Sequence, residues 1–283
     1  MTLILIILLL ILGLATGFYS GLIGTGGNLI LIPALDLLFA HYQIAGVEAV
    51  KFIIAHSLFI TIFLGVSISI KQHRIGNFYL KEVILIGLPG MISAYLMSEL
   101  INAFDWYNKF YFDIIFLMMI VLLAFRLLVV KSKEDQITQV TPHQTTLSFA
   151  SLTGLGFLTG IVTALSGLGG GIVLIPFLTD INKTPIRKAS AISIGVITML
   201  AAAVSMSYLF VEENADYSGR LPAQVGYISL YMVLPILVGI FLASSFGVRV
   251  AHRTSPQRLR VIFGIIVTML CLKMAYSLLS PAF

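Results

Sequence analysis

Charged residues are scarce in this sequence. Asp, Glu, Lys and Arg together make up 10% of its 283 residues, whereas soluble domains carry about 25%. Hydrophobic residues make up 59%, and apolar runs of about 20 residues, long enough to cross a bilayer as a helix, recur along the chain. Because helices satisfy their own backbone polar groups in lipid, the composition predicts an all-α polytopic membrane protein. We expect it in the cell (inner) membrane.

The sequence has a single cysteine and lacks a nucleotide-binding phosphate loop. The single cysteine, Cys271, cannot form an internal disulfide and is a poor metal site by itself. The sequence contains no Gly-Lys-Ser or Gly-Lys-Thr phosphate loop, so ATP-driven pumping by this chain is not expected. We therefore expect neither a metal nor a cofactor.

The positive charges lie mostly in loops. The net charge is +5, and most Lys and Arg residues fall between apolar runs, where they keep loops on the cytoplasmic side of a membrane. The excess is therefore a signal of topology and not of nucleic-acid binding. We expect the lipid bilayer as a partner, and a homodimer is one arrangement that the sequence leaves open.

The sequence contains an internal duplication. The segment "LIGTGGNLILIP", which ends at Pro33, aligns without a gap with "LSGLGGGIVLIP", which ends at Pro176. Self-similarity of this kind is common in secondary transporters. The duplication divides the chain into a first transmembrane repeat (1–131), a polar cytoplasmic linker (132–146) and a second transmembrane repeat (147–283).

Each repeat is predicted to contain a long apolar segment that glycines break, followed by three ordinary spans. In the first repeat these four segments are residues 2–40, 50–70, 80–101 and 109–130. In the second repeat they are residues 147–179, 187–211, 223–247 and 256–279.

Loop charge predicts that the two repeats have inverted orientations in the membrane. The loop at 71–81 is basic and its counterpart at 212–222 is net acidic, so the first should be cytoplasmic and the second external. Inversion requires an odd number of crossings per repeat. Each glycine-broken segment should then enter and return as a hairpin of two half-spans, with both chain termini outside. The alternative is one long tilted helix, which glycine runs disfavour.

The glycine clusters, "GTGGN" at 24–28 and "SGLGGG" at 166–171, are predicted to break the helices. Non-helical backbone at membrane depth is tolerated where it is buried in protein or lines a polar cavity. A helix that begins after the break presents free N–H groups at the positive end of its dipole. We therefore expect the breaks to meet near the midplane and bind a small anionic substrate. The alternative is close helix packing, as expected for Gly17, Gly21 and Gly160.

The predicted substrate-binding residues are those of the two breaks together with one serine from the span after each break. The two serines, Ser57 and Ser193, occupy matching places in the repeats. Each hydroxyl can either donate to a substrate oxygen or bond back to its own helix. The full set is Gly24, Thr25, Gly26, Gly27, Asn28, Ser57, Ser166, Gly167, Gly169, Gly170, Gly171 and Ser193.

Two ionisable residues lie near the first of these serines. His56 is inside an apolar run, where it can act in proton coupling or serve as a hydrogen-bonded packing residue. Lys51 can balance a bound anion or extend its ammonium to the membrane interface, and we favour the interface.

Several motifs together resemble the TauE/SafE family of sulfite and sulfonate permeases. They are the doubled glycine pattern that ends at Pro33 and Pro176, "HRIGNF" at 73–78 and "GVRVAHRTSPQRLRVIFGIIVTMLCLKM" at 247–274. The resemblance covers essentially the whole chain. It implies a secondary transporter, an exporter by the family's name, of small sulfur-containing anions such as sulfite or organosulfonates. The sequence departs from the pattern at His56, where a small or hydroxyl residue is expected.

Two other functions fit parts of the sequence. A passive anion channel shares most of these features with a carrier. The segment "ALSG" at 164–167 is similar to the nucleophile segment of rhomboid intramembrane proteases, which requires a histidine base beside the serine. Only His252 follows Ser166 in the sequence, and it lies in a basic loop. We therefore expect no enzyme activity.

Overall fold

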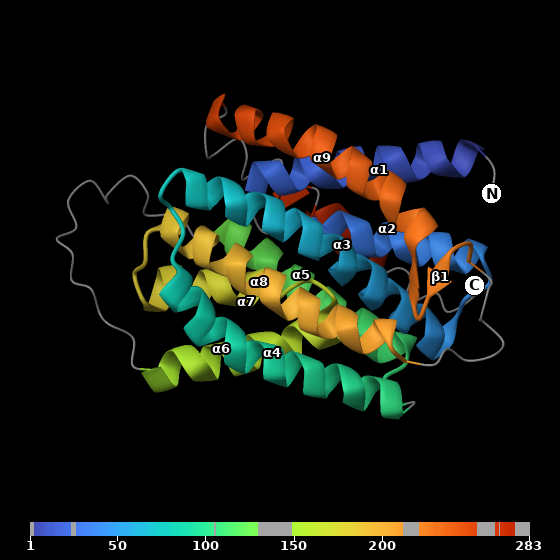
Figure 1. Cartoon of the computed structure of the whole chain (residues 1–283), viewed down its shortest axis with the longest axis horizontal. Coiled ribbons are helices and arrows are strands. Elements are labelled where there is room, and N and C mark those ends of the chain that lie inside the picture. Colours follow the sequence, from blue (N-terminus) through green and yellow to red (C-terminus); the bar gives the residue numbers. More distant parts are fainter. Residues whose placement is uncertain are drawn as a thin grey trace.

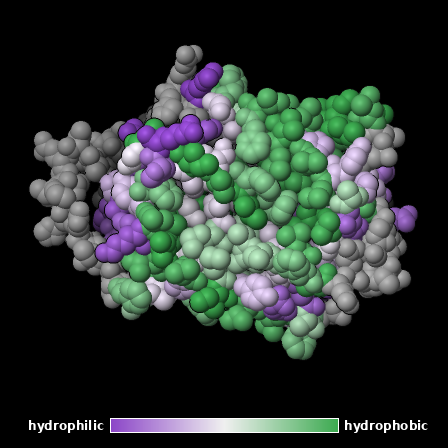
Figure 2. Space-filling view, viewed as in Figure 1, coloured by the Kyte–Doolittle hydropathy of each residue, from purple (hydrophilic) through white to green (hydrophobic). Residues whose placement is uncertain are grey.

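The computed structural model describes residues 3–23, 27–104, 106–129, 149–211, 221–253, 264–265 and 267–274. Within these ranges, six helices are long and apolar enough to cross a membrane. They are α1 (Leu3–Ile23), α3 (Gly46–Arg74), α4 (Leu80–Ala103), α6 (Phe149–Ser166), α8 (Ile186–Leu209) and α9 (Leu230–Arg253). Figure 2 shows hydrophobic residues over the middle of one face and hydrophilic residues mostly toward its ends. The predicted all-α, multi-pass membrane protein is confirmed.

The remaining elements are shorter or carry more charge. Helix α5 (Lys109–Val129) contains Lys109, Asp113 and Arg126, and residues 267–274 are also helical. Two short helices follow the glycine clusters: α2 (Asn28–His41), and α7 (Gly171–Pro176) with its π-helical continuation η2 (Phe177–Ile181). Strands β1 (Gln224–Val225) and β2 (Ile228–Ser229) pair antiparallel.

One predicted span begins later than expected. The span placed at 223–247 is helical only from Leu230 and continues to Arg253, because residues 224–229 form the β1–β2 hairpin. Ala223 and Gly226 both have positive φ angles, of 50° and 54°, which turn the backbone where a helix would otherwise continue. The first eight residues of the span predicted at 256–279 lie outside the described residues.

The glycine-broken segments differ from the predicted pairs of half-spans. In Figure 1, α1 runs inward from the N-terminus and α2 returns toward the same side. However, α1 has 21 residues, about 30 Å of helix, which is enough to cross the hydrocarbon core alone. In this first segment only α2, with 14 residues, is short. The reason is that no glycine cluster interrupts the apolar run before residue 24.

The first helix of each repeat packs on a helix of the other repeat. Helix α1 lies along α9, and α6 lies along α4. A Cβ on Gly17 would approach Ile240 Cα to 2.6 Å, and a Cβ on Gly160 would approach Ala94 N to 3.0 Å. These glycines let two helix backbones approach closely. The contacts therefore agree with the packing role predicted for Gly17 and Gly160.

One pair of corresponding helices, α3 and α8, runs in opposite directions. Helix α8 runs parallel to α4, because Lys188 pairs with Glu82 near one end and Ser207 bonds to Asn102 near the other. Helix α3 joins α4 through a short turn and runs opposite to it, so α3 is antiparallel to its counterpart α8 (Figure 1). The orientation in a membrane and the repeat limits stay predictions. The linker at 132–146 lies outside the described residues.

The close packing of α6 on α4 yields a stability prediction. Gly160→Ala places a methyl group against Ser93 and the backbone of Gly90, and we expect it to lower the free energy of unfolding by about 1–3 kcal/mol. Gly154 lies on the same helix, and no atom comes within 4 Å of a Cβ built on it. Gly154→Ala should therefore leave stability unchanged or raise it. Thermal unfolding in detergent measures both, and equal melting temperatures would contradict the packing role.

Candidate functional site

The second glycine cluster breaks the helix through its backbone conformation. Gly167, Gly169 and Gly170 have φ angles of +67°, +81° and +70°, a region that residues with a Cβ rarely adopt. Helix α6 consequently ends at Ser166 and α7 begins at Gly171. At the first cluster, Gly24, Thr25 and Gly26 lie outside the described residues, and α2 begins at Asn28.

The last glycine before each new helix packs on a threonine of the preceding helix. A Cβ on Gly27 would lie 3.1 Å from the Thr16 carbonyl oxygen, and a Cβ on Gly170 would lie 3.1 Å from the Thr159 carbonyl oxygen. Both would also meet the methyl group of the same threonine. The matched Thr and Gly residues of the two repeats therefore make the same contact, which holds each short helix against its own first helix.

Asn28 joins the two breaks. Its Nδ2 donates to the carbonyl oxygen of Gly167 at 2.7 Å, and the Thr61 hydroxyl lies 2.9 Å from its Oδ1. Thr61 is also 2.8 Å from the carbonyl oxygen of Ser57. Asn28 is 2% exposed, so these bonds are made inside the protein. The structure thus brings together residues of the first repeat and the break of the second.

Sequence reasoning missed Thr61. It lies one helical turn after Ser57, so the two share a face of α3. Its counterpart in the second repeat is Ile197, whose side chain would lie 2.8 Å from a Cβ on Gly169. The same face of each long helix therefore contacts a glycine break. The spacing from Ser57 was the available signal.

The two matched serines have different hydrogen bonds. Ser57 lies beside the break, since a Cβ on Gly167 would be 3.2 Å from its Oγ. Its hydroxyl donates to the Ile54 carbonyl at 3.1 Å, which is the back-bond to its own helix. Ser193 is also fully buried, but its Oγ has no hydrogen-bond partner among the described residues. Ser193 precedes Ile197 by one turn and so shares the helix face directed at Gly169.

Ser166 closes the last turn of α6. Its hydroxyl donates to the Val162 carbonyl at 2.7 Å and accepts the N–H of Leu168 at 3.2 Å. Neither partner is an imidazole, so the contacts give no support to a serine nucleophile with a histidine base. Beyond the break, the described residues offer no acceptor to the N–H groups of Gly171 and Ile172, as expected in the first turn of a helix.

The geometry at His56 fits the packing alternative. Its Nδ1 lies 2.8 Å from the Phe52 carbonyl, and Ser229 donates its backbone N–H to Nε2 at 2.9 Å. These partners require a neutral ring with the proton on Nδ1. The ring also packs against Phe39, with centroids 5.1 Å apart. Proton coupling through His56 stays a hypothesis that these contacts do not support.

The expected extension of Lys51 to the interface is wrong. Lys51 is 6% exposed, and its Nζ lies 3.3 Å from Glu48 Oε1 and 5.6 Å from the centroid of the Tyr227 ring. Tyr227 belongs to the turn of the β1–β2 hairpin, which covers this end of α3. The sequence pattern did not reveal that cover, because the hairpin lies in a segment that resembles the start of a span.

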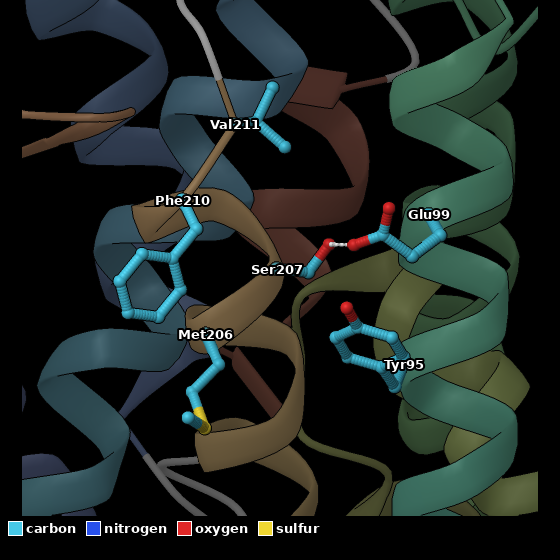
Figure 3. A pocket seen from close by; sticks show the side chains of 6 residues that line it. All are labelled: Tyr95, Glu99, Met206, Ser207, Phe210 and Val211. Carbon is cyan, nitrogen blue, oxygen red and sulfur yellow. Dashed lines mark hydrogen bonds between the residues drawn. The ribbon is translucent and has the colours of Figure 1, made fainter.

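An open cleft lies between α4 and α8, away from the predicted residues (Figure 3). It has a volume of about 270 Å³ and is lined by Tyr95, Glu99, Met206, Ser207, Phe210 and Val211. Ser207 donates to Glu99 Oε1 at 2.8 Å. None of the residues predicted from the sequence lines this cleft. In the described parts of the breaks and the helix faces beside them, Asn28, Ser57 and Ser193 are all buried.

The bridge formed by Asn28 yields a second stability prediction. Asn28→Ala leaves the Gly167 carbonyl without its donor, whereas the Thr61 hydroxyl keeps the Ser57 carbonyl as its acceptor. We expect a loss of about 1–3 kcal/mol in the free energy of unfolding. Asn77→Ala is the control, because Asn77 lies in the loop after α3, where it donates to Gln72 and, at 3.4 Å in an exposed bond, to the Arg187 carbonyl. Unfolding in detergent compares them. Equal stability of the two variants would mean that the bridge contributes nothing.

Comparison with known proteins identifies the family. The family model described as sulfite exporter TauE/SafE matches residues 9–274. A probable membrane transporter protein of Methanocaldococcus jannaschii is 31% identical over 268 residues, which cover 94% of this chain and 93% of the relative. Probable membrane transporter proteins of Haemophilus influenzae (26% identical; 95% and 97% covered) and Bacillus subtilis (22% identical; 96% and 97% covered) are also similar. No solved structure matches significantly. The chain belongs to the TauE/SafE family, as its motifs predicted.

Proposed function

We propose that the chain is a secondary transporter that exports small sulfur-containing anions, such as sulfite or organosulfonates. The family description and the names of the relatives support transport, and the family description supports the class of anion. The observation that carries the binding site is the hydrogen bond from Asn28 to the Gly167 carbonyl, because it joins the two breaks. Transport, and not catalysis, is the function that the residues support.

The donors around the second break suit an oxyanion. The first N–H groups of the helix that begins at Gly171 have no acceptor among the described residues, and they lie at the positive end of the helix dipole. The Ser193 hydroxyl is buried without a partner in the described part of the chain. Sulfite and sulfonate oxygens accept such bonds, and glycine permits close approach to the backbone.

A carrier is favoured over a passive channel by the burial of the side chains that lie where the breaks meet. Asn28 and Ser57 are 2% and 0% exposed, and Asn28 spans from one break to the other. A continuous open pore would leave such side chains exposed where the breaks meet. In a carrier, this arrangement corresponds to a closed step of alternating access, from which one repeat, or the short helices, moves to admit the anion. The homodimer stays a prediction.

The inverted topology yields a labelling prediction. Single cysteines at 77 and 214, introduced into a Cys271→Ala background, should differ in accessibility from outside. We expect a membrane-impermeant thiol reagent to label position 214 and not position 77, because the loop at 71–81 is basic and the loop at 212–222 is net acidic. Labelling of both positions from one side would refute the inversion. The reverse pattern would refute the assigned orientation of the termini.

Flux in proteoliposomes tests the transport function. Sulfite, sulfoacetate, sulfate and chloride are loaded separately, and wild type is compared with Gly170→Val. Valine at this position, where φ is +70°, strains the backbone and meets Thr159 and Thr163, so we expect saturable movement of sulfite or sulfoacetate to fall to background. Gly154→Val, where nothing lies within 4 Å, is the control and should retain flux.

A milder variant separates loss of binding from loss of folding. Ser193→Ala removes a buried hydroxyl that has no partner in the described structure, so folding should be unaffected while the KM for the anion rises about 3- to 10-fold. Movement of neither sulfite nor sulfoacetate by wild type would refute the proposed substrate class. Equal flux in wild type and Gly170→Val would refute the binding site.

A further inference from the structure

A buried polar cluster lies under the β1–β2 hairpin. We define it as Glu48 and Lys51 of α3, Tyr208 of α8, Tyr227 of the hairpin turn, and Tyr107, which precedes α5. Lys51 is 6% exposed, Tyr227 is 1% exposed, and Tyr107 and Tyr208 are 0% exposed. A cation this deeply buried is rare in proteins unless it is paired or functional.

The contacts of the cluster lead from the hairpin to the second glycine break. The Lys51 Nζ lies 5.6 Å from the Tyr227 ring centroid, and the rings of Tyr227 and Tyr208 are 6.0 Å apart. Tyr208 interacts electrostatically with Tyr107 and Glu48. The Tyr107 hydroxyl donates to the carbonyl oxygen of Leu165 at 2.5 Å, directly before the break. The cluster therefore adjoins the proposed binding site.

Two polar atoms of the cluster have unmet hydrogen-bonding capacity. Glu48 Oε1 is paired with Lys51, but Glu48 Oε2 is buried and has no partner in the described part of the chain. The Tyr208 hydroxyl is likewise buried without one. Buried polar atoms are nearly always hydrogen-bonded, and each exception requires an explanation such as a ligand or a proton. One of the unmet atoms is a carboxylate acceptor of the ion pair, and the other is a hydroxyl that can donate.

We propose that the Lys51–Glu48 pair is a second anion-binding point, where the transported oxyanion displaces Glu48 from Lys51 and Glu48 takes up a proton. The proposal rests on the proposed transport function and adds a coupling ion to it. The proton and the anion move in the same direction, so export proceeds when the outward anion gradient exceeds the inward proton gradient. The Lys51 ammonium then holds the anion, and the Tyr208 hydroxyl can donate to it. Release of the anion returns Lys51 to Glu48, and the proton leaves. One proton from the aqueous phase thus accompanies each anion.

Charge balance requires that proton. In the resting cluster, the charges of Lys51 and Glu48 cancel. If an anion took Lys51 while Glu48 remained ionised, an unpaired carboxylate would stay buried, which is strongly unfavourable. A protonated Glu48 is neutral and can use its O–H as a donor. Anion binding and protonation are therefore favourable together and unfavourable apart.

The titratable groups that face the pair single out Glu48 as the proton site. Tyr227 faces it from the hairpin and Tyr208 from α8, with Tyr107 beyond Tyr208. Glu99 of α4 also interacts with Tyr208 but already accepts from Ser207 at the open cleft. His56 lies farther along α3 with both ring nitrogens bonded to backbone groups. Among these described groups, Glu48 alone pairs with a buried cation.

The test measures anion and proton movement together. Proteoliposomes carrying a pH-sensitive dye are given sulfoacetate outside, with and without an inward proton gradient. In wild type, we expect the gradient to accelerate anion entry and protons to enter with the anion. Glu48→Gln should keep anion entry but lose both the acceleration and the proton entry. Lys51→Met should raise the KM for sulfoacetate about 10- to 100-fold.

Matched controls come from a surface ion pair. Lys188 and Glu82 form the same kind of pair at 2.9 Å, with side chains about one-third exposed (33% and 31%). Lys188→Met and Glu82→Gln should therefore behave like wild type. Because Lys51→Met alone leaves Glu48 unpaired, the double variant Glu48→Gln/Lys51→Met is included. It buries no unpaired charge and should fold, bind sulfoacetate weakly and move no protons.

Each outcome decides a different claim. If Gly170→Val abolishes flux while Glu48→Gln keeps wild-type proton entry, the coupling role of the pair is overturned and the transport function stands. Loss of gradient dependence in His56→Gln, but not in Glu48→Gln, also overturns it. If wild type moves no sulfoacetate, both the transport function for this anion class and the coupling are overturned.

Discussion

The break in α6 and α7 is the constraint on which the rest of the structure depends. Three glycines with positive φ angles interrupt the helix between Ser166 and Gly171. Backbone that leaves helical geometry inside a membrane must be buried in protein or line a polar cavity. Asn28 supplies part of that cover by bonding to the Gly167 carbonyl from the opposite repeat. A site of this kind therefore requires both halves of the chain. This explains why one repeat alone would not suffice.

The first helix of each repeat packs on a helix of the other repeat, and this packing holds the two breaks next to each other. Helix α1 packs on α9 and α6 on α4, in both cases through glycines that allow backbone contact. Each short helix is held in turn by a Gly–Thr contact to its own first helix. The short helices are thus fixed at their first residues, whereas Asn28 and the Lys51–Glu48 pair are polar contacts that an anion can replace. The close helix packing thus stays fixed, while the polar contacts inside it can change when an anion binds.

Composition and apolar runs were sufficient to predict the helical class and most spans. The duplication was sufficient to predict that the segments of Asn28 and Gly167 lie close together, because paired Gly and Pro residues leave a strong signal. It was not sufficient to identify Thr61, because only the hydrogen bond to Asn28 in the folded structure distinguishes Thr61 from the other hydroxyl residues of α3. The burial of Lys51 and the bonds of His56 depend on a hairpin hidden in an apolar segment. Loop charge indicates on which side of the membrane each loop lies, but it carries no information on helix length. The prediction of two half-spans therefore did not foresee that α1 is long enough to cross the membrane alone.

The central claim is that a small sulfur-containing anion binds where the two breaks meet. An experimental structure determined with a saturating concentration of a transported anion, sulfite or sulfoacetate, tests it most directly. We expect density for the anion within hydrogen-bond distance of the backbone between Gly167 and Ile172, close to Ser193. Density confined to the cleft beside Tyr95 and Glu99, with Asn28 still bonded to Gly167, would contradict it.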